Sequence, residues 1–132
     1  MRAYRNLKVW SKSMDMVDEV YKASSLFPKD ETYGLRSQIR RSAVSIPSNI
    51  AEGSQRNSKK EFQQFIAISY ASLAELETQL EIAFRQSYIT EKSKDDIFLM
   101  SAEVGKMLNG LAASFDKKLP TANCNLQTLQ EA

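Results

Sequence analysis

The chain has 132 residues and a mass of 15.0 kDa, enough for one domain with its own core but not for two. It contains no histidine and one cysteine, which excludes histidine-based triads, disulfides within the chain and cysteine-based zinc sites. Residues 1–60 hold 12 Lys/Arg against 6 Asp/Glu, and residues 61–132 hold 6 against 10, so the net charge of +2 falls short of a dedicated nucleic-acid-binding domain.

The first predicted helix covers residues 6–26. Phe27-Pro28 ends it, because a residue before proline avoids helical backbone angles. Apolar residues at helical spacing form two neighbouring stripes along it. The stripe that we assign to the core contains Leu7, Trp10, Met14, Val17 and Tyr21. The second stripe contains Val9, Met16, Val20 and Ala23.

The second predicted helix begins near Asp30, a residue type that caps helix N-termini. Pro47 falls inside its apolar pattern and has no N–H, so it leaves the carbonyl of Ala43 without its usual partner and predicts a bend. Gly53 predicts the C-terminal stop. The residues expected to face inward are Leu35, Ile39, Ala43, Ile46 and Ile50.

The third predicted helix starts at the capping box of Ser58 and Glu61 and ends near Ser87. Its core positions alternate in steps of four and three: Phe62, Ile66, Ser69, Leu73, Leu76, Leu80 and Ala83. The fourth starts near Thr90 or Ser93 and continues to about residue 118. Its stripe contains Ile97, Met100, Val104, Met107, Leu111 and Phe115.

Four long amphipathic helices with short connections predict an all-α protein, an antiparallel up-down four-helix bundle over residues 1–118. We expect residues 119–132, which include Cys124, to form a flexible C-terminal tail. One core does not use every apolar side chain, so we hypothesise a surface for self-association; a broad core-facing stripe explains the surplus equally well. The candidate interface residues are Val9, Met16, Val20, Phe65 and Ile68.

Six cations near the middle of the chain are the candidate nucleic-acid-binding residues: Arg36, Arg40, Arg41, Arg56, Lys59 and Lys60. Such a patch can contact phosphates. Solvated arginines, or arginines that pair with the acidic half of another copy, are the alternative interpretation. No aromatic residue interleaves within the patch, which weighs against a base-stacking platform.

The remaining polar residues are interpreted as structural. Asn49, with Ser45 and Ser48, can build a small polar network beside Pro47, and Glu52 can pair with an arginine. Three glutamates of the third helix, Glu75, Glu77 and Glu81, lack the histidines of bundle di-iron sites. We therefore assign no catalytic residue, no metal and no cofactor.

Residues 35–53, which read LRSQIRRSAVSIPSNIAEG, resemble the signature of the four-helix bundle proteins known as the 23S rRNA intervening-sequence protein family. Residues 7–10, 27–28, 31–35 and 72–80 are also similar to that family. The resemblance implies a bacterial antiparallel bundle that assembles as a homopentamer around a central pore, without an established enzymatic activity. A related branch, an accessory protein of diversity-generating retroelements, is more basic and binds nucleic acid and a reverse transcriptase.

These observations predict a non-enzymatic, homopentameric adaptor or scaffold whose partners are its own copies and, as candidates, RNA, DNA or a nucleic-acid-processing protein. The alternative is a metal-dependent nuclease that uses Glu52 with Arg40 and Arg41. The charged N-terminal residues do not read as a secretory signal and no window reaches the roughly 20 apolar residues of a membrane span, so we expect a cytoplasmic location.

Overall fold

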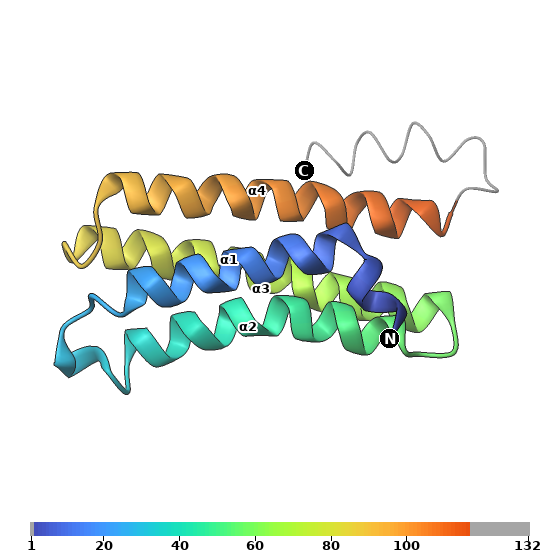
Figure 1. Ribbon diagram of the computed structural model, residues 1–132, viewed down its shortest axis with the longest axis horizontal. Helices are drawn as coiled ribbons and strands as arrows, with labels where there is room; N and C mark the ends of the chain where they lie inside the picture. Colours follow the sequence, from blue (N-terminus) through green and yellow to red (C-terminus); the bar gives the residue numbers. More distant parts are fainter. Residues whose placement is uncertain (1, 117–132) are drawn as a thin grey trace.

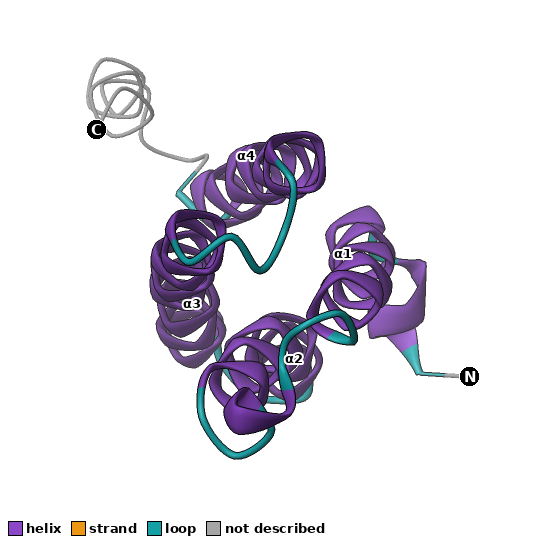
Figure 2. Ribbon diagram, turned by 90° about the vertical axis from the view of Figure 1, so that its left-hand side faces the viewer, coloured by secondary structure: helices purple, strands orange, loops and turns teal. Residues whose placement is uncertain are grey.

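The computed structural model describes residues 2–116, which form four long helices and two short 3-10 helices (Figure 1). In chain order these are η1 (Ala3–Asn6), α1 (Lys8–Ser24), η2 (Lys29–Glu31), α2 (Leu35–Ser54), α3 (Lys59–Arg85) and α4 (Glu91–Ser114). Successive long helices run antiparallel around one core (Figure 2), which confirms the predicted bundle. The predicted tail and Cys124 lie outside the described residues.

The start of α3 follows the predicted capping chemistry, and the start of α4 uses a cap of the same kind. The Ser58 hydroxyl accepts a hydrogen bond from the Glu61 N–H at 3.1 Å at the start of α3, and the Thr90 hydroxyl accepts one from the Ser93 N–H at 3.1 Å at the start of α4. These hydroxyls satisfy N–H groups that have no partner within the helix. None of the described helices combines the length and apolar character needed to cross a bilayer.

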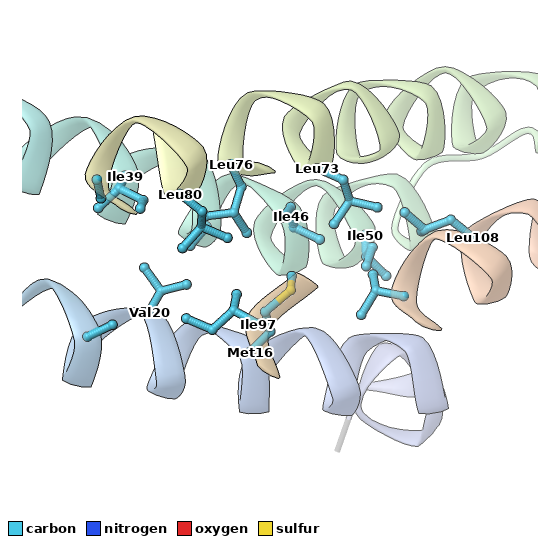
Figure 3. Packing of buried hydrophobic residues seen from close by; sticks show 14 of the residues in the cluster. Met16, Val20, Ile39, Ile46, Ile50, Leu73, Leu76, Leu80, Ile97 and Leu108 are labelled. Atoms are coloured by element: carbon cyan, nitrogen blue, oxygen red, sulfur yellow. The ribbon is translucent and has the colours of Figure 1, made fainter. Parts of the chain in front are cut away.

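The core is a continuous apolar cluster to which all four long helices contribute. Figure 3 shows side chains from α1 to α4 that point toward one another in the interior of the bundle. The largest fully buried apolar side chains are Met16, Val20, Ile39, Ile46, Ile50, Leu76, Leu80, Ile97, Val104 and Leu108. Burial of this apolar surface is the main source of stability in the fold.

The predicted orientation of α1 is wrong. Val9, Met16 and Val20 were candidate interface residues, but their exposed fractions are 5%, 0% and 0%, so they belong to the core of this chain. Met14 and Tyr21, which were assigned to the core, are 39% and 42% exposed. The helix is therefore rotated relative to the prediction, with the second stripe facing inward.

A buried serine explains why the sequence pattern predicts the wrong buried face for α1. Ser13 occupies the position between Val9 and Met16 in the inward stripe and is fully buried. Its hydroxyl donates a hydrogen bond to the Trp10 carbonyl at 2.8 Å, so the polar group is satisfied inside the core. The stripe that faces inward therefore looks interrupted in the sequence.

The start of α2 also differs from the prediction, because Asp30 does not cap it. The helix begins at Leu35, whose N–H donates to the Glu31 carboxylate at 2.9 Å, while the Tyr88 hydroxyl donates to the other Glu31 oxygen at 2.9 Å. These two donors hold the pKa of Glu31 below its usual value. A Cβ atom at Gly34 would lie 2.6 Å from the same carboxylate, so glycine leaves the room that this cap requires.

Gly53 does not act as the predicted helix stop. It is buried within α2, which continues to Ser54, and it has a negative φ. A Cβ atom at this position would lie 2.6 Å from the Phe65 Cβ and 2.9 Å from the Phe62 ring. The missing side chain therefore lets α2 and α3 approach closely.

Hydroxyl groups line the contact between α2 and α3. The Ser42 hydroxyl donates to the Gln79 side chain at 2.7 Å, and the Ser69 hydroxyl donates to the Ile46 carbonyl at 3.0 Å. The hydroxyls of Ser45 and Ser72 lie 3.0 Å apart. We refer to these three pairings as the hydroxyl ladder.

Asn49 extends this polar contact within α2. Its amide donates to the Ser45 carbonyl at 2.8 Å and to the Ser45 hydroxyl at 3.0 Å. Among the described residues, Ser45 and Asn49 beside Pro47 thus pair with each other, and Ser45 also pairs with Ser72 of α3. Ser48 is exposed.

Candidate nucleic-acid interface

Arg36 and Arg40 tie the end of α1 to α2. The Arg36 guanidinium donates to the Ser24 carbonyl at 3.0 Å and to the Phe27 carbonyl. The Arg40 guanidinium donates to the Ser24 hydroxyl at 2.8 Å and to the Tyr21 carbonyl at 3.2 Å, and it lies 4.4 Å from the centre of the Tyr21 ring. Both arginines thus bind polar groups at the C-terminal end of α1, in addition to the backbone N–H groups of Ser25 and Phe27 that already bond the Tyr21 and Ser24 carbonyls.

The six predicted cations do not form one patch. Arg40 and Arg56 are separated by about 24 Å along α2, from a rise of about 1.5 Å per residue. Arg56 pairs with Glu52 at 2.8 Å and lies 4.9 Å from the centre of the Phe65 ring. Arg41 is exposed on the outer face of α2. The fold therefore separates Arg36, Arg40 and Arg41 from the other three.

A different group of cations gathers where the chain begins. The 3-10 helix η1 packs against α1 and α2, and the Arg2 guanidinium donates to the Gln55 side chain at 3.4 Å. This contact brings the N-terminal residues beside the α2–α3 loop (Figure 1). We call the resulting cluster the basic end; its members are Arg2, Arg5, Lys8, Arg56, Lys59 and Lys60.

The basic end carries a net positive charge. Three carboxylates lie on the ends of α2, α3 and α4 that meet here, those of Glu52, Glu61 and Asp116, so the six cations outnumber them. All six cationic residues are exposed. Sequence reasoning missed the N-terminal three members because about 50 residues separate them from Arg56. An up-down bundle places the start of its first helix beside the end of its second, and that rule could have found them.

An apolar groove between α1 and α2 begins beside the basic end. It has a volume of about 310 Å³ and is lined by Tyr4, Trp10, Met14, Val17, Val44, Pro47, Ser48 and Ala51. The rings of Tyr4 and Trp10 meet edge to face, with their centres 5.2 Å apart. The Arg5 guanidinium lies 5.4 Å from the centre of the Trp10 ring. The fold therefore places the aromatic rings of Tyr4 and Trp10 next to the cations of the basic end, a proximity that the sequence pattern did not predict.

The residues of the nuclease alternative are not assembled. Glu52 and Arg40 lie about 18 Å apart along α2 at about 1.5 Å per residue. Glu52 is exposed and its partner is Arg56, while Arg40 is engaged with α1. This separation contradicts a shared catalytic role for these two residues.

The glutamates of α3 are engaged in contacts with their neighbours. Glu77 accepts a hydrogen bond from the Ser101 hydroxyl of α4. Glu81 pairs with Arg85, four residues further along the helix, at 3.0 Å, and with Lys94 at 3.5 Å. The Arg85 hydrogen bond holds the pKa of Glu81 below its usual value. Within residues 2–116, no group of three or more acidic, histidine or cysteine side chains is arranged to hold a metal ion.

Two predicted interface residues remain at the surface of α3. Phe65 is half-buried beneath Arg56, and Ile68 is 48% exposed. Ile82 is 43% exposed and falls near the same outward face as Ile68, four helical turns further on, with the exposed Ala71, Glu75 and Thr78 between them. We call Ile68, Ala71 and Ile82 the α3 strip.

The described residues thus define an all-helical bundle protein with a cluster of six exposed cations at one end. The family model for the 23S rRNA-intervening sequence protein matches residues 5–110. The chain belongs to this family, as its sequence resemblance implied.

A solved structure supports this assignment. It is a 1.70 Å crystal structure from Bacteroides thetaiotaomicron, described as a protein with unknown function from the S23 ribosomal protein family. The two chains are 30% identical, the match covers 79% of this chain and 97% of that chain, and the TM-score is 0.71. None of the curated proteins compared with this chain matches it.

Proposed function

We propose that this protein is a non-enzymatic adaptor that binds nucleic acid through the phosphate backbone and associates with its own copies. The observation that carries the nucleic-acid part is the basic end, where two segments distant in the sequence bring six exposed cations together. Neutralising phosphates with lysine and arginine releases condensed counterions, which favours binding without sequence specificity. The positive N-terminal end of the α3 dipole lies at the same place and adds to this attraction.

We expect the double variant Lys59→Gln, Lys60→Gln to bind single-stranded RNA about tenfold more weakly than the unmodified protein at 50 mM salt. The dependence of log affinity on log salt should become shallower by about 1.4, since each lost phosphate contact removes about 0.7 for a single strand. Both lysines are exposed in the first turn of α3, where positive charge is unfavourable, so the variant should remain folded. Fluorescence anisotropy with a labelled oligonucleotide measures both quantities.

The matched control is the double variant Lys22→Gln, Lys29→Gln, which removes two exposed lysines at the opposite end of the bundle. Its affinity should stay within about twofold of the unmodified protein. Equal losses in both variants would show that total charge governs binding, and no retention of RNA by the unmodified protein at low salt would refute the nucleic-acid proposal.

The self-association part rests on the α3 strip, because exposed apolar side chains on one helix face favour packing against another copy. We propose five copies, the ring size that the family resemblance implies, which corresponds to 75 kDa from five chains of 15.0 kDa. Ile68→Glu should shift the solution mass toward 15.0 kDa because it places a charge in the contact. Sedimentation equilibrium measures this mass directly.

The control for self-association is Leu99→Glu, which makes the same kind of change at an exposed apolar position of α4 outside the strip. It should leave the mass unchanged. A mass of 15.0 kDa for the unmodified protein at every concentration would contradict self-association, and an unchanged mass for Ile68→Glu would remove the α3 strip from the contact.

A further inference from the structure

The apolar groove between α1 and α2 has the size and lining of a site for a flat aromatic group. Its volume of about 310 Å³ is at the lower end of the range for small-molecule sites. Apolar side chains form most of its lining, and two aromatic rings, those of Tyr4 and Trp10, stand at the end that adjoins η1. Ser48 adds one hydroxyl that can donate or accept a hydrogen bond at the edge of such a group.

The charges around the groove indicate what kind of aromatic ligand it fits. Arg5 already lies against the Trp10 ring, and Arg2, the residue before the same short helix, contacts Gln55 at the end of α2. A ligand that enters at Tyr4 and Trp10 therefore keeps its ring in the groove and any attached anion among the cations of the basic end. A nucleotide within a polynucleotide has this combination of a flat base and neighbouring phosphates.

We propose that the groove holds an unpaired base of single-stranded nucleic acid, whose adjoining phosphates lie on the basic end. The proposal rests on the proposed function, since it adds a base-binding subsite to the same surface. A base inside a duplex is paired and stacked on both faces, so it cannot enter without being extruded. The groove therefore makes the protein prefer single strands, whereas the basic end alone attracts every polyanion.

The protein carries its own probe for this site, because Trp10 is its single tryptophan. Intrinsic fluorescence can be followed while three polyanions are added separately: oligouridylate, an RNA duplex of the same length, and inorganic polyphosphate. Oligouridylate should quench Trp10 by stacking and should bind about tenfold more tightly than the duplex. Polyphosphate should bind in a competition assay while it leaves Trp10 fluorescence unchanged.

Two variants test the groove, one by removing an aromatic ring and one by filling the space. Tyr4→Leu removes one ring, and Ser48→Phe fills the groove from an exposed position of α2. Each should weaken oligouridylate binding several-fold and leave polyphosphate binding unchanged. Tyr33→Leu is the control, since it removes a 96% exposed tyrosine at the opposite end of the bundle and should change neither affinity.

The possible failures are separable. If all three polyanions bind equally and none quenches Trp10, the base site is wrong while phosphate binding stands. If no polyanion binds, the proposed function fails and the base site fails with it. If Trp10 fluorescence changes with protein concentration alone, a second copy occupies the groove and the base site is overturned.

Discussion

Gly53→Ala should lower the free energy of unfolding by about 1–3 kcal/mol, the usual cost of overpacking a close contact. The new Cβ would lie 2.6 Å from the Phe65 Cβ, an atom that is fixed to the α3 backbone. Rotating a side chain cannot relieve this contact, so α2 and α3 must move apart. The loss should appear although alanine is the better helix former by about 1 kcal/mol.

Urea unfolding followed by circular dichroism measures this effect, and the chain supplies a matched control. Gly110 also lies within a helix, but a Cβ there would meet no atom within 4 Å. Gly110→Ala should therefore raise the free energy of unfolding by up to about 1 kcal/mol. If the two substitutions changed the free energy of unfolding by the same amount in the same direction, the close approach of α2 and α3 would not be the reason that position 53 is a glycine.

Arg36→Met should lower the free energy of unfolding by about 2–3 kcal/mol, because it removes two hydrogen bonds from a charged donor. The carbonyls of Ser24 and Phe27 would lose these partners, and Phe27 is itself buried at 4% exposure. Methionine retains most of the apolar stem, so the loss reports mainly on the guanidinium. Urea unfolding again provides the measurement.

The control is Arg41→Met, at an exposed position of the same helix, whose effect should stay within about 0.5 kcal/mol. RNA binding by folded Arg36→Met should remain within twofold of the unmodified protein, since Arg36 lies far from the basic end. A large loss of RNA affinity together with unchanged stability would restore the role that the sequence pattern assigned to Arg36.

The sequence was sufficient to predict the class of fold and four helices, because apolar spacing and capping residues such as Ser58 and Thr90 are local signals. It was not sufficient to choose the buried face of α1. Ser13 looks polar in the sequence, yet its hydroxyl is satisfied by the Trp10 carbonyl of its own helix and can occupy the core. Such local compensation hides a core position from hydropathy patterns.

The candidate site was predicted only in part, because charge alone does not say which partner a charged residue will find. Arg56, Lys59 and Lys60 lie exposed at the basic end as a group. Arg36 and Arg40 look equivalent to them in the sequence, but carbonyl groups at the end of α1 lie within hydrogen-bonding distance of their guanidinium groups. That proximity arises from the packing of α1 on α2, which no local pattern encodes.

The hydroxyl ladder between α2 and α3 has a consequence for how the two helices align. Apolar contacts tolerate sliding, but hydrogen bonds are directional, so a shift by one turn would break the pairings of Ser42, Ser45 and Ser69 together. The register of this helical hairpin is therefore locked by polar atoms. The start of α3, with Lys59 and Lys60, therefore has a fixed position along the bundle axis relative to α2, which the N-terminal residues contact through Arg2 and Gln55. Buried hydroxyl groups thus determine the spacing between the two halves of the basic end.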